Sequence, residues 1–418
     1  MINGILCFQH INLSNGANMI FMKFKAILGK RFWLLYMVVF TLPMYMRLNN
    51  YLLGAYIIVG LLHLFFRIKK INIRTLKAGW PIFGFFILGI MGSFYGTTFL
   101  NGFKLLEKYW AFLLLPLLML TDKNEYSKRR EDIFLSLVLG SAATLIICYG
   151  NLIYEMVSRN EPISYFFRWR HLGHQFTEIA DTHPTYLGVF VVISIVFMFT
   201  SNKMGNAIKL PLILFFLFGL FQLASRIALF LAILFLMLLV FNRTKKQWAL
   251  LVFLSLGIVV GILVFKKMGS KYVKDRLFTV ESALNDKRFQ RWDASYEIFK
   301  ENPFFGVGFS QIESIRHDKY MEYGFEVAAR QDLNAHNQFL EFLSRNGVVG
   351  GFVYVCSLGF LLLLSMYRRD YLFSLIFFVF IMANVSESML VRIKGIEFFA
   401  IFATLFLCGF NQKTLEKE

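Results

Sequence analysis

The sequence is poor in charge for a chain of 418 residues. Asp, Glu, Lys and Arg together make up 17% of it, whereas they make up about a quarter of an ordinary soluble domain. Apolar residues take their place: 57% of the chain is hydrophobic, and 50 phenylalanines lie in long runs without charge. This composition excludes a disordered chain and nearly every soluble enzyme, and it predicts an all-α polytopic membrane protein.

Cysteine is also scarce, and its spacing excludes a thiol-based redox or zinc site. Cys7, Cys148, Cys356 and Cys408 are scattered without a CxxC pair, so we interpret them as small buried hydrophobes. The chain has no DxD motif, which argues against a metal-dependent nucleotide-sugar transferase. The histidine-rich stretch 171–183 lacks an HExxH framework. We therefore expect no metal and no cofactor.

Basic residues outnumber acidic ones, 44 against 26, which gives a net charge of +18. In a soluble domain such an excess would indicate nucleic acid binding. Here the basic residues cluster between apolar runs, where membrane topology requires them. We therefore expect membrane lipids as partners and no nucleic acid.

Twelve apolar runs are long enough to be membrane-spanning helices, which need about 20 residues, or fewer where their ends snorkel. The expected spans are 32–46, 50–66, 80–97, 107–121, 132–153, 184–200, 207–223, 227–241, 248–265, 346–366, 371–385 and 396–411. Basic clusters fall in alternate connections, which places both termini in the cytoplasm, and we expect no cleaved leader.

This topology divides the chain into five parts and leaves two long loops, 154–183 and 267–337, on the opposite face. The second loop is expected to be a mostly helical cap. The five parts are a cytoplasmic segment 1–31, nine helices over 32–266, the external loop 267–337, three helices over 338–411 and a cytoplasmic tail 412–418.

One apolar stretch, from Leu210 to Phe241, is too long for a single crossing at about 1.5 Å per residue. Basic residues flank it on both sides, so the chain must go out and come back. The polar break at 222–226 is the expected turn, and it places Arg226 at the external membrane boundary. An arginine there either serves a substrate or snorkels to lipid headgroups.

The cap carries two more arginines, Arg288 and Arg291, one turn apart at the start of a predicted amphipathic helix. We expect this helix to lie on the bilayer or against the helix bundle. Its apolar face comprises Phe289, Trp292, Tyr296 and Phe299. Two guanidiniums at this spacing can grip a diphosphate, and the alternative is a basic face on anionic lipid.

His336 stands at the start of the helix that follows the cap, with Asn334 or Asn337 as the expected N-cap. Helical spacing predicts an inward-facing stripe with the histidine at its outer tip. The stripe comprises His336, Phe339, Leu340 and Leu343. The positive end of a helix dipole disfavours imidazolium, and a general base must be a neutral imidazole. The alternative is a histidine whose ring is satisfied by backbone groups.

Three motifs together resemble the bacterial O-antigen ligase and polymerase superfamily, whose members are polytopic with one enlarged periplasmic loop. Ser225–Ala228 is similar to its (S/T)RxA/G element. The stretch from Arg288 to Gly308 resembles its RxxxW…NPxxGxG pattern, and that from His336 to Gly350 resembles its HNxxLxxLxxxGxxG pattern. The resemblance spans most of the chain, and the last two motifs in this order are its specific part.

The resemblance implies transfer of a glycan from an undecaprenyl-diphosphate carrier to an acceptor hydroxyl, on the periplasmic face of the inner membrane. It implies that His336 is the catalytic base and that Arg226 and Arg288 are the essential arginines. Direct attack on the anomeric carbon would invert its configuration. The residues expected to bind substrate are Arg291, Asn337, Arg170, which adds charge on the same face, and Glu387, an acidic residue at the outer end of a span.

Several acceptors fit these motifs. We favour a ligase, which passes the glycan to a lipid A-core sugar, over a Wzy-type O-antigen polymerase and a protein O-oligosaccharyltransferase. A lipid-linked-sugar transporter is the alternative from another class. It predicts charged residues at the membrane midplane and two repeated halves, whereas the candidate residues here gather at one end.

Overall fold

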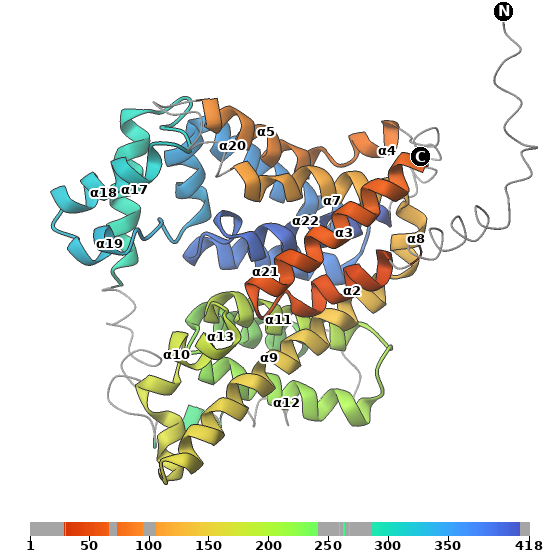
Figure 1. Cartoon of the computed structure of the whole chain (residues 1–418), viewed down its shortest axis with the longest axis vertical. Helices are drawn as coiled ribbons and strands as arrows, with labels where there is room; N and C mark the ends of the chain where they lie inside the picture. Colours follow the sequence, from red (N-terminus) through yellow and green to blue (C-terminus); the bar gives the residue numbers. More distant parts are fainter. Residues whose placement is uncertain are drawn as a thin grey trace, which may run out of the picture.

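The computed structural model describes residues 31–66, 73–94, 106–240 and 286–409, together with single positions at 29, 259, 262, 263 and 267. Within these residues every regular element is a helix, as the composition predicts. Figure 1 shows the helices gathered into one bundle, with α17, α18 and α19 grouped at one side next to α20.

The first part of the chain contributes helices of very different length. They are α2 Arg31–Thr41, α3 Met46–Phe66, α4 Ile73–Lys77, α5 Trp80–Phe94, α7 Trp110–Thr121, α8 Lys123–Lys128, α9 Arg130–Ser158, α11 Pro184–Thr200, α12 Asn206–Gln222 and α13 Arg226–Val240. Short turns fill the connections: η2 Glu107–Tyr109, η3 Ile163–Phe167, η4 Trp169–His171, α10 His174–Thr177 and η5 Glu178–Ala180.

The second part builds the cap and returns to the bundle. Its elements are α17 Arg288–Glu301, α18 Ile312–Glu322, α19 Glu326–Arg330, α20 Gln338–Tyr367, α21 Tyr371–Ser386, η6 Met389–Val391 and α22 Ile393–Cys408. The described part of the expected cap is helical, as predicted. Its remainder, 268–285, lies outside the described residues.

Eleven of the twelve expected spans fall on described helices, and the twelfth, 248–265, lies largely outside the described residues. Three of the described helices, α3, α9 and α20, are long and apolar enough to cross a membrane. A fourth crossing results if 169–180 and 184–200, bent by 82°, form one span. The number of twelve stays a prediction.

Some helices are shorter than the apolar runs that predict them. The expected span 32–46 is interrupted, because α2 ends at Thr41 and α3 begins at Met46. Pro43 lies in this break, and proline both lacks an N–H donor and restricts the residue before it. An apolar run therefore overstates the length of a helix where a proline divides it.

Helix α22 is the centre of the bundle, since every residue from Lys394 to Cys408 is buried. Its Phe399 ring lies 5.6 Å from that of Phe85 in α5 and 5.3 Å from that of Phe380 in α21. A helix that is apolar on all sides must be covered on all sides. Its burial fixes the start of α22 and the loop before it, which reaches the candidate site.

The predicted aromatic face of α17 is exposed in part, since Phe289 and Tyr296 are 43% and 47% exposed. The buried residues of α17 are Arg291, Ala294, Ser295 and Ile298. Ala294 packs with Tyr320 and Ala329, and Ile298 packs with Val307 and Ile312. This side of α17 therefore faces the rest of the cap.

The glycine-rich motifs serve backbone packing between the cap and α20. Helix α20 is kinked at Gly347, which has φ +62° and ψ −156°, a conformation adopted almost only by glycine. The kink releases carbonyl oxygens of α20, and Gly308 N–H donates to that of Arg345 at 2.8 Å. In return Val348 N–H donates to the carbonyl of Pro303 at 2.8 Å. These bonds join the cap to the bundle.

We expect Gly347→Ala to destabilise the protein strongly. A Cβ at this position would lie 2.4 Å from backbone atoms of Phe304, and the strained backbone itself costs about 1–3 kcal/mol. Gly359→Ala in the same helix is the control, because nothing lies within 4 Å of its added Cβ. Thermal unfolding in detergent measures both, and an unchanged midpoint for Gly347→Ala would contradict the kink.

Candidate active site

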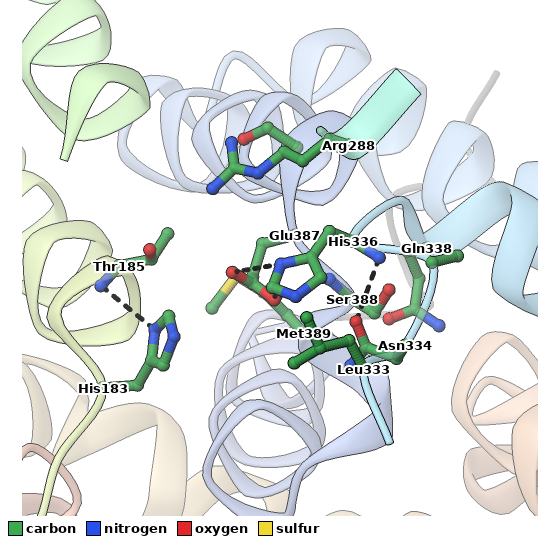
Figure 2. A network of polar contacts seen from close by, with 12 residues as sticks. His183, Thr185, Arg288, Leu333, Asn334, His336, Gln338, Glu387, Ser388 and Met389 are labelled. Carbon is green, nitrogen blue, oxygen red and sulfur yellow. Dashed lines mark hydrogen bonds and ion pairs between the residues drawn. The ribbon is translucent and has the colours of Figure 1, made fainter. Parts of the chain in front are cut away.

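His336 and Glu387 meet although they are far apart in the sequence. The imidazole Nδ1 of His336 lies 3.2 Å from both carboxylate oxygens of Glu387. Glu387 is 2% exposed and His336 15% exposed, so the pair faces a small opening to solvent. Figure 2 shows the two side chains pointing at one another, with Arg288 and His183 on different sides of the carboxylate. From the sequence, Glu387 is expected only as an acidic residue at the outer end of a span.

The backbone around His336 is held in an uncommon conformation. His336 has φ +47°, a left-handed backbone conformation that is uncommon for residues other than glycine. Residues held in such conformations cluster at functional sites. Its N–H donates to Oδ1 of Asn334 at 3.0 Å. Asn337 is the N-cap of α20, with its Oδ1 accepting from Leu340 N–H at 3.1 Å. Of the two expected caps, Asn337 is therefore the observed one.

The predicted inward stripe that starts at His336 is wrong in part. His336 precedes the cap residue, so its side chain is not on a helix face, and Phe339 is 39% exposed. The left-handed turn, which helical spacing does not take into account, redirects the ring toward Glu387. The histidine is still at the start of α20, as expected.

A buried ion cluster supports the His336 turn. Glu341 is 0% exposed, and its Oε1 lies 2.8 Å from Nη2 of Arg316 in the cap and 2.7 Å from Nε of Arg345. Its Oε2 accepts from the N–H of Ala335 at 3.0 Å. One carboxylate thus ties α18, α20 and the residue before His336 together. In the sequence, the only signal of this role of Glu341 is an acidic residue at the start of an apolar helix.

The loop that carries Glu387 is fixed by three bonds from different elements. Met389 N–H donates to Oδ1 of Asn384 at 3.2 Å. Leu390 N–H donates to Oε1 of Gln338 at 2.6 Å, and the Tyr186 hydroxyl donates to the carbonyl of Ser388 at 3.1 Å. Helices α11, α20 and α21 therefore position the acid, which places it directly beside the histidine.

The surroundings keep Glu387 ionised. Burial alone raises the pKa of its carboxyl, but the hydrogen bond and charge of His336, together with His183 and Arg288, outweigh burial and hold the pKa at about 2. A carboxylate that stays ionised can orient an imidazole and stabilise its protonated form. The pair thus has the arrangement of a base and its orienting acid.

His183 caps α11 and lies on the far side of Glu387. Its Nδ1 accepts from Thr185 N–H at 3.3 Å, and Pro184 is the first residue of the helix, as the sequence predicts. Burial lowers the pKa of His183 to about 3, more than the Glu387 charge raises it. Its ring is therefore neutral at physiological pH, and it faces the ring of His174 at 4.3 Å.

The structure distributes the expected arginines unevenly. Arg288 lies beside the pair (Figure 2), and Arg291, 9% exposed, is buried one turn further on. Arg226 begins α13 directly after the predicted break and is partly buried, and this segment packs on α11 near Gly188. Arg170 is exposed on η4, with its guanidinium 5.5 Å from the ring centre of Trp169. Arg170 lines the same pocket as Trp169, whereas His183 lines a neighbouring pocket.

The histidine-rich loop does not form a metal centre in the described residues. No group of three or more His, Cys, Asp or Glu side chains there is arranged to hold a metal ion. His174 and His183 lie together, but Asp181 uses its Oδ2 to accept from Met46 N–H at 3.2 Å.

A comparison with protein-family models finds one match, to the family described as O-antigen ligase, over residues 210–355. This segment contains Arg226, Arg288, Arg291, His336 and Glu341, and it ends before Glu387. The match supports the resemblance to the O-antigen ligase superfamily that the three motifs predict. No curated protein matches the chain.

The match and the apolar helices together support a membrane protein with an activity of the O-antigen ligase or polymerase type. Members of this family are glycosyltransferase-like proteins that act on lipid-linked glycans.

Removing the buried carboxylate of Glu341 should lower the free energy of unfolding more than removing the exposed carboxylate of Glu326. Glu341→Ala leaves Arg316 and Arg345 buried without their counter-ion, which costs about 3–5 kcal/mol of unfolding free energy. Glu326→Ala is the control, because its pair with Arg330 is 61% and 77% exposed and contributes at most about 1 kcal/mol. Equal unfolding midpoints for the two variants would show that the cluster is not structural.

The neutral state of His183 predicts acid sensitivity. Its pKa is about 3 in the folded protein and about 6.5 when unfolded, so the unfolded state takes up the proton first as pH falls. The stability of the folded protein should therefore fall as the pH falls below 6.5. The stability of His183→Asn should fall less, because asparagine keeps a capping oxygen but does not titrate. Unfolding midpoints between pH 7 and pH 4 measure this, with the exposed His317→Asn as control. Equal slopes for wild type and His183→Asn would refute it.

Proposed function

We propose that the protein is an O-antigen ligase that transfers a glycan from undecaprenyl diphosphate to a hydroxyl of a lipid A-core sugar. The observation that carries the proposal is the His336–Glu387 pair, with Nδ1 3.2 Å from the carboxylate and Arg288 beside it. A histidine oriented by a buried acid is suited to deprotonate a hydroxyl, and an arginine beside it is suited to a phosphate.

His336 acts as the general base. Because Nδ1 faces Glu387, Nε2 is the nitrogen left to accept the proton of the acceptor hydroxyl. The oxygen attacks the anomeric carbon, a new glycosidic bond forms, and the bond between that carbon and the phosphate oxygen breaks. Glu387, which the sequence analysis assigned to substrate binding, serves as a positioning residue that stabilises the imidazolium.

Arginines stabilise the leaving group. Undecaprenyl diphosphate departs with the bonding electrons, and guanidiniums at Arg288 and Arg226 neutralise the charge that develops on it. Arg291, buried three residues after Arg288 in α17, supports the same site, and Asn337 and Arg170 contribute to substrate binding. Since guanidiniums supply this charge, the step needs no metal ion or cofactor. Attack from the side opposite the diphosphate inverts the anomeric configuration.

The reaction takes place on the periplasmic side of the bacterial inner membrane, with both termini in the cytoplasm. About twelve spans, with the cap 267–337 outside, follow from the basic residues in alternate connections. In this topology His336, Arg288 and Arg226 share the periplasmic end, where a lipid carrier holds its diphosphate at the headgroup plane.

His336→Ala and Glu387→Gln should each lower transfer by about 10²–10⁴-fold at normal protein level, because base catalysis is lost or misdirected. The test uses a host deleted for this gene and complemented with each variant. Surface lipopolysaccharide and carrier-linked glycan are resolved by gel and mass. Arg330→Gln, exposed on α19, is the control and should behave as wild type.

The deletion host also separates the possible acceptors. Bare core with long glycan still accumulating on its carrier identifies a ligase, whereas core bearing a single repeat identifies a polymerase. Normal pools in the deletion host would contradict glycan transfer to either acceptor and favour a protein acceptor or a transporter. Wild-type transfer by His336→Ala would refute the role of the histidine.

A further inference from the structure

Two neighbouring pockets lie near the candidate active site, and together we call them the groove. The first, of 340 Å³, is lined by His174, His183 and Tyr186 together with Arg392 and Lys394. The second, of 530 Å³, is lined by Trp169, Arg170 and residues of α9. Gln175 and Glu178 are exposed and line both pockets, so the two pockets share part of their walls.

The first pocket is linked to the His336–Glu387 pair by two of its lining residues. Tyr186 lines the pocket, and its hydroxyl donates to the carbonyl of Ser388, the residue after Glu387. His183 lines it as well, and the charges of Glu387 and His336 contribute to the pKa of its imidazole. The groove thus lies on the side of the pair where His183 and Tyr186 are.

The groove suits a neutral polyhydroxylated ligand. Its lining combines four carboxylates with five basic side chains, so the formal charges nearly cancel. These are Glu155, Glu161, Glu178 and Asp181 against Arg159, Arg168, Arg170, Arg392 and Lys394. A polyanion would meet four carboxylates here, and an apolar ligand would leave all nine charges without hydration. Sugar hydroxyls both donate and accept, and they match such a lining.

Two further features favour a saccharide. Trp169 is 46% exposed on the groove, and an exposed indole offers a flat apolar face against which a sugar ring can lie. Lys394 is buried and donates to the carbonyl of Asp181 at 3.0 Å, and an ammonium carries three N–H donors. The combined volume falls within the range of sites that enclose small ligands and is open enough for a chain of sugars.

We propose that this groove binds the acceptor saccharide. This inference rests on the proposed transfer reaction. An inverting displacement requires the acceptor oxygen to enter on the side opposite the departing diphosphate. Arg288, assigned to the diphosphate, and His183, at the groove, lie on different sides of the Glu387 carboxylate (Figure 2). The acceptor therefore reaches His336 from the groove, and Trp169 and Arg392 hold its sugars.

Binding without turnover provides the first test. The probe is core oligosaccharide released from lipid A by mild acid, titrated by calorimetry into His336→Ala protein in detergent. Adding Trp169→Ala or Arg392→Gln should weaken binding by about tenfold or more. Trp33→Ala is the matched control, because Trp33 is 67% exposed on α2, outside the groove, and should leave the affinity unchanged. Equal affinities for all variants would overturn the proposal.

Steady-state transfer provides the second test and separates the acceptor from the donor. With His336 intact, Trp169→Ala and Arg392→Gln should raise the KM for core-only lipopolysaccharide about tenfold and leave kcat and the donor KM unchanged. A raised KM for the donor alone would overturn the proposal. If the wild type transfers nothing while oligosaccharide binding still depends on Trp169, the proposed function fails and the saccharide groove stands.

Discussion

The fully buried carboxylate of Glu341 holds the site together. It forms ion pairs with Arg316 from the cap and Arg345 from its own helix, and its second oxygen accepts from the N–H of Ala335. A charge at 0% exposure is tolerated only where partners satisfy it, so these contacts fix each other. Because Ala335 precedes His336, the cluster that docks the cap also sets the direction of the candidate base. Docking of the cap and orientation of the candidate base therefore share one constraint.

The aromatic core and the kinked helix fix the other half of the site. Helix α22 is covered on all sides, which leaves the loop before it little freedom and holds Glu387 near α20. The kink at Gly347 lets the 303–308 backbone bond to α20, which brings α17 and Arg288 to the same end. Packing of apolar helices and backbone hydrogen bonds at two glycines thus bring together Arg288, His336 and Glu387, which are far apart in the sequence.

Prediction from the sequence was most successful where the signal was local. The break at 222–226 and the helix that starts with the proline after His183 depend on a few neighbouring residues, and both are observed. The N-cap of α20 is Asn337, one of the two asparagines expected there. The stripe from His336 failed because spacing assumes an unbroken helix, whereas this residue has φ +47°. The expected span 32–46 is too long, because the apolar run contains Pro43 and α2 ends before it, at Thr41.

The sequence by itself determined that the chain is helical and apolar, which residues are candidates for chemistry and which family its central segment resembles. These properties follow from composition, period and motif, which are local features of the chain. Only the tertiary structure decided that Glu387 faces His336, that Glu341 holds the turn before it and that a pocket lined by His183 and Tyr186 lies nearby. Such contacts join distant segments, and their geometry is set by how whole helices pack, which no local pattern encodes.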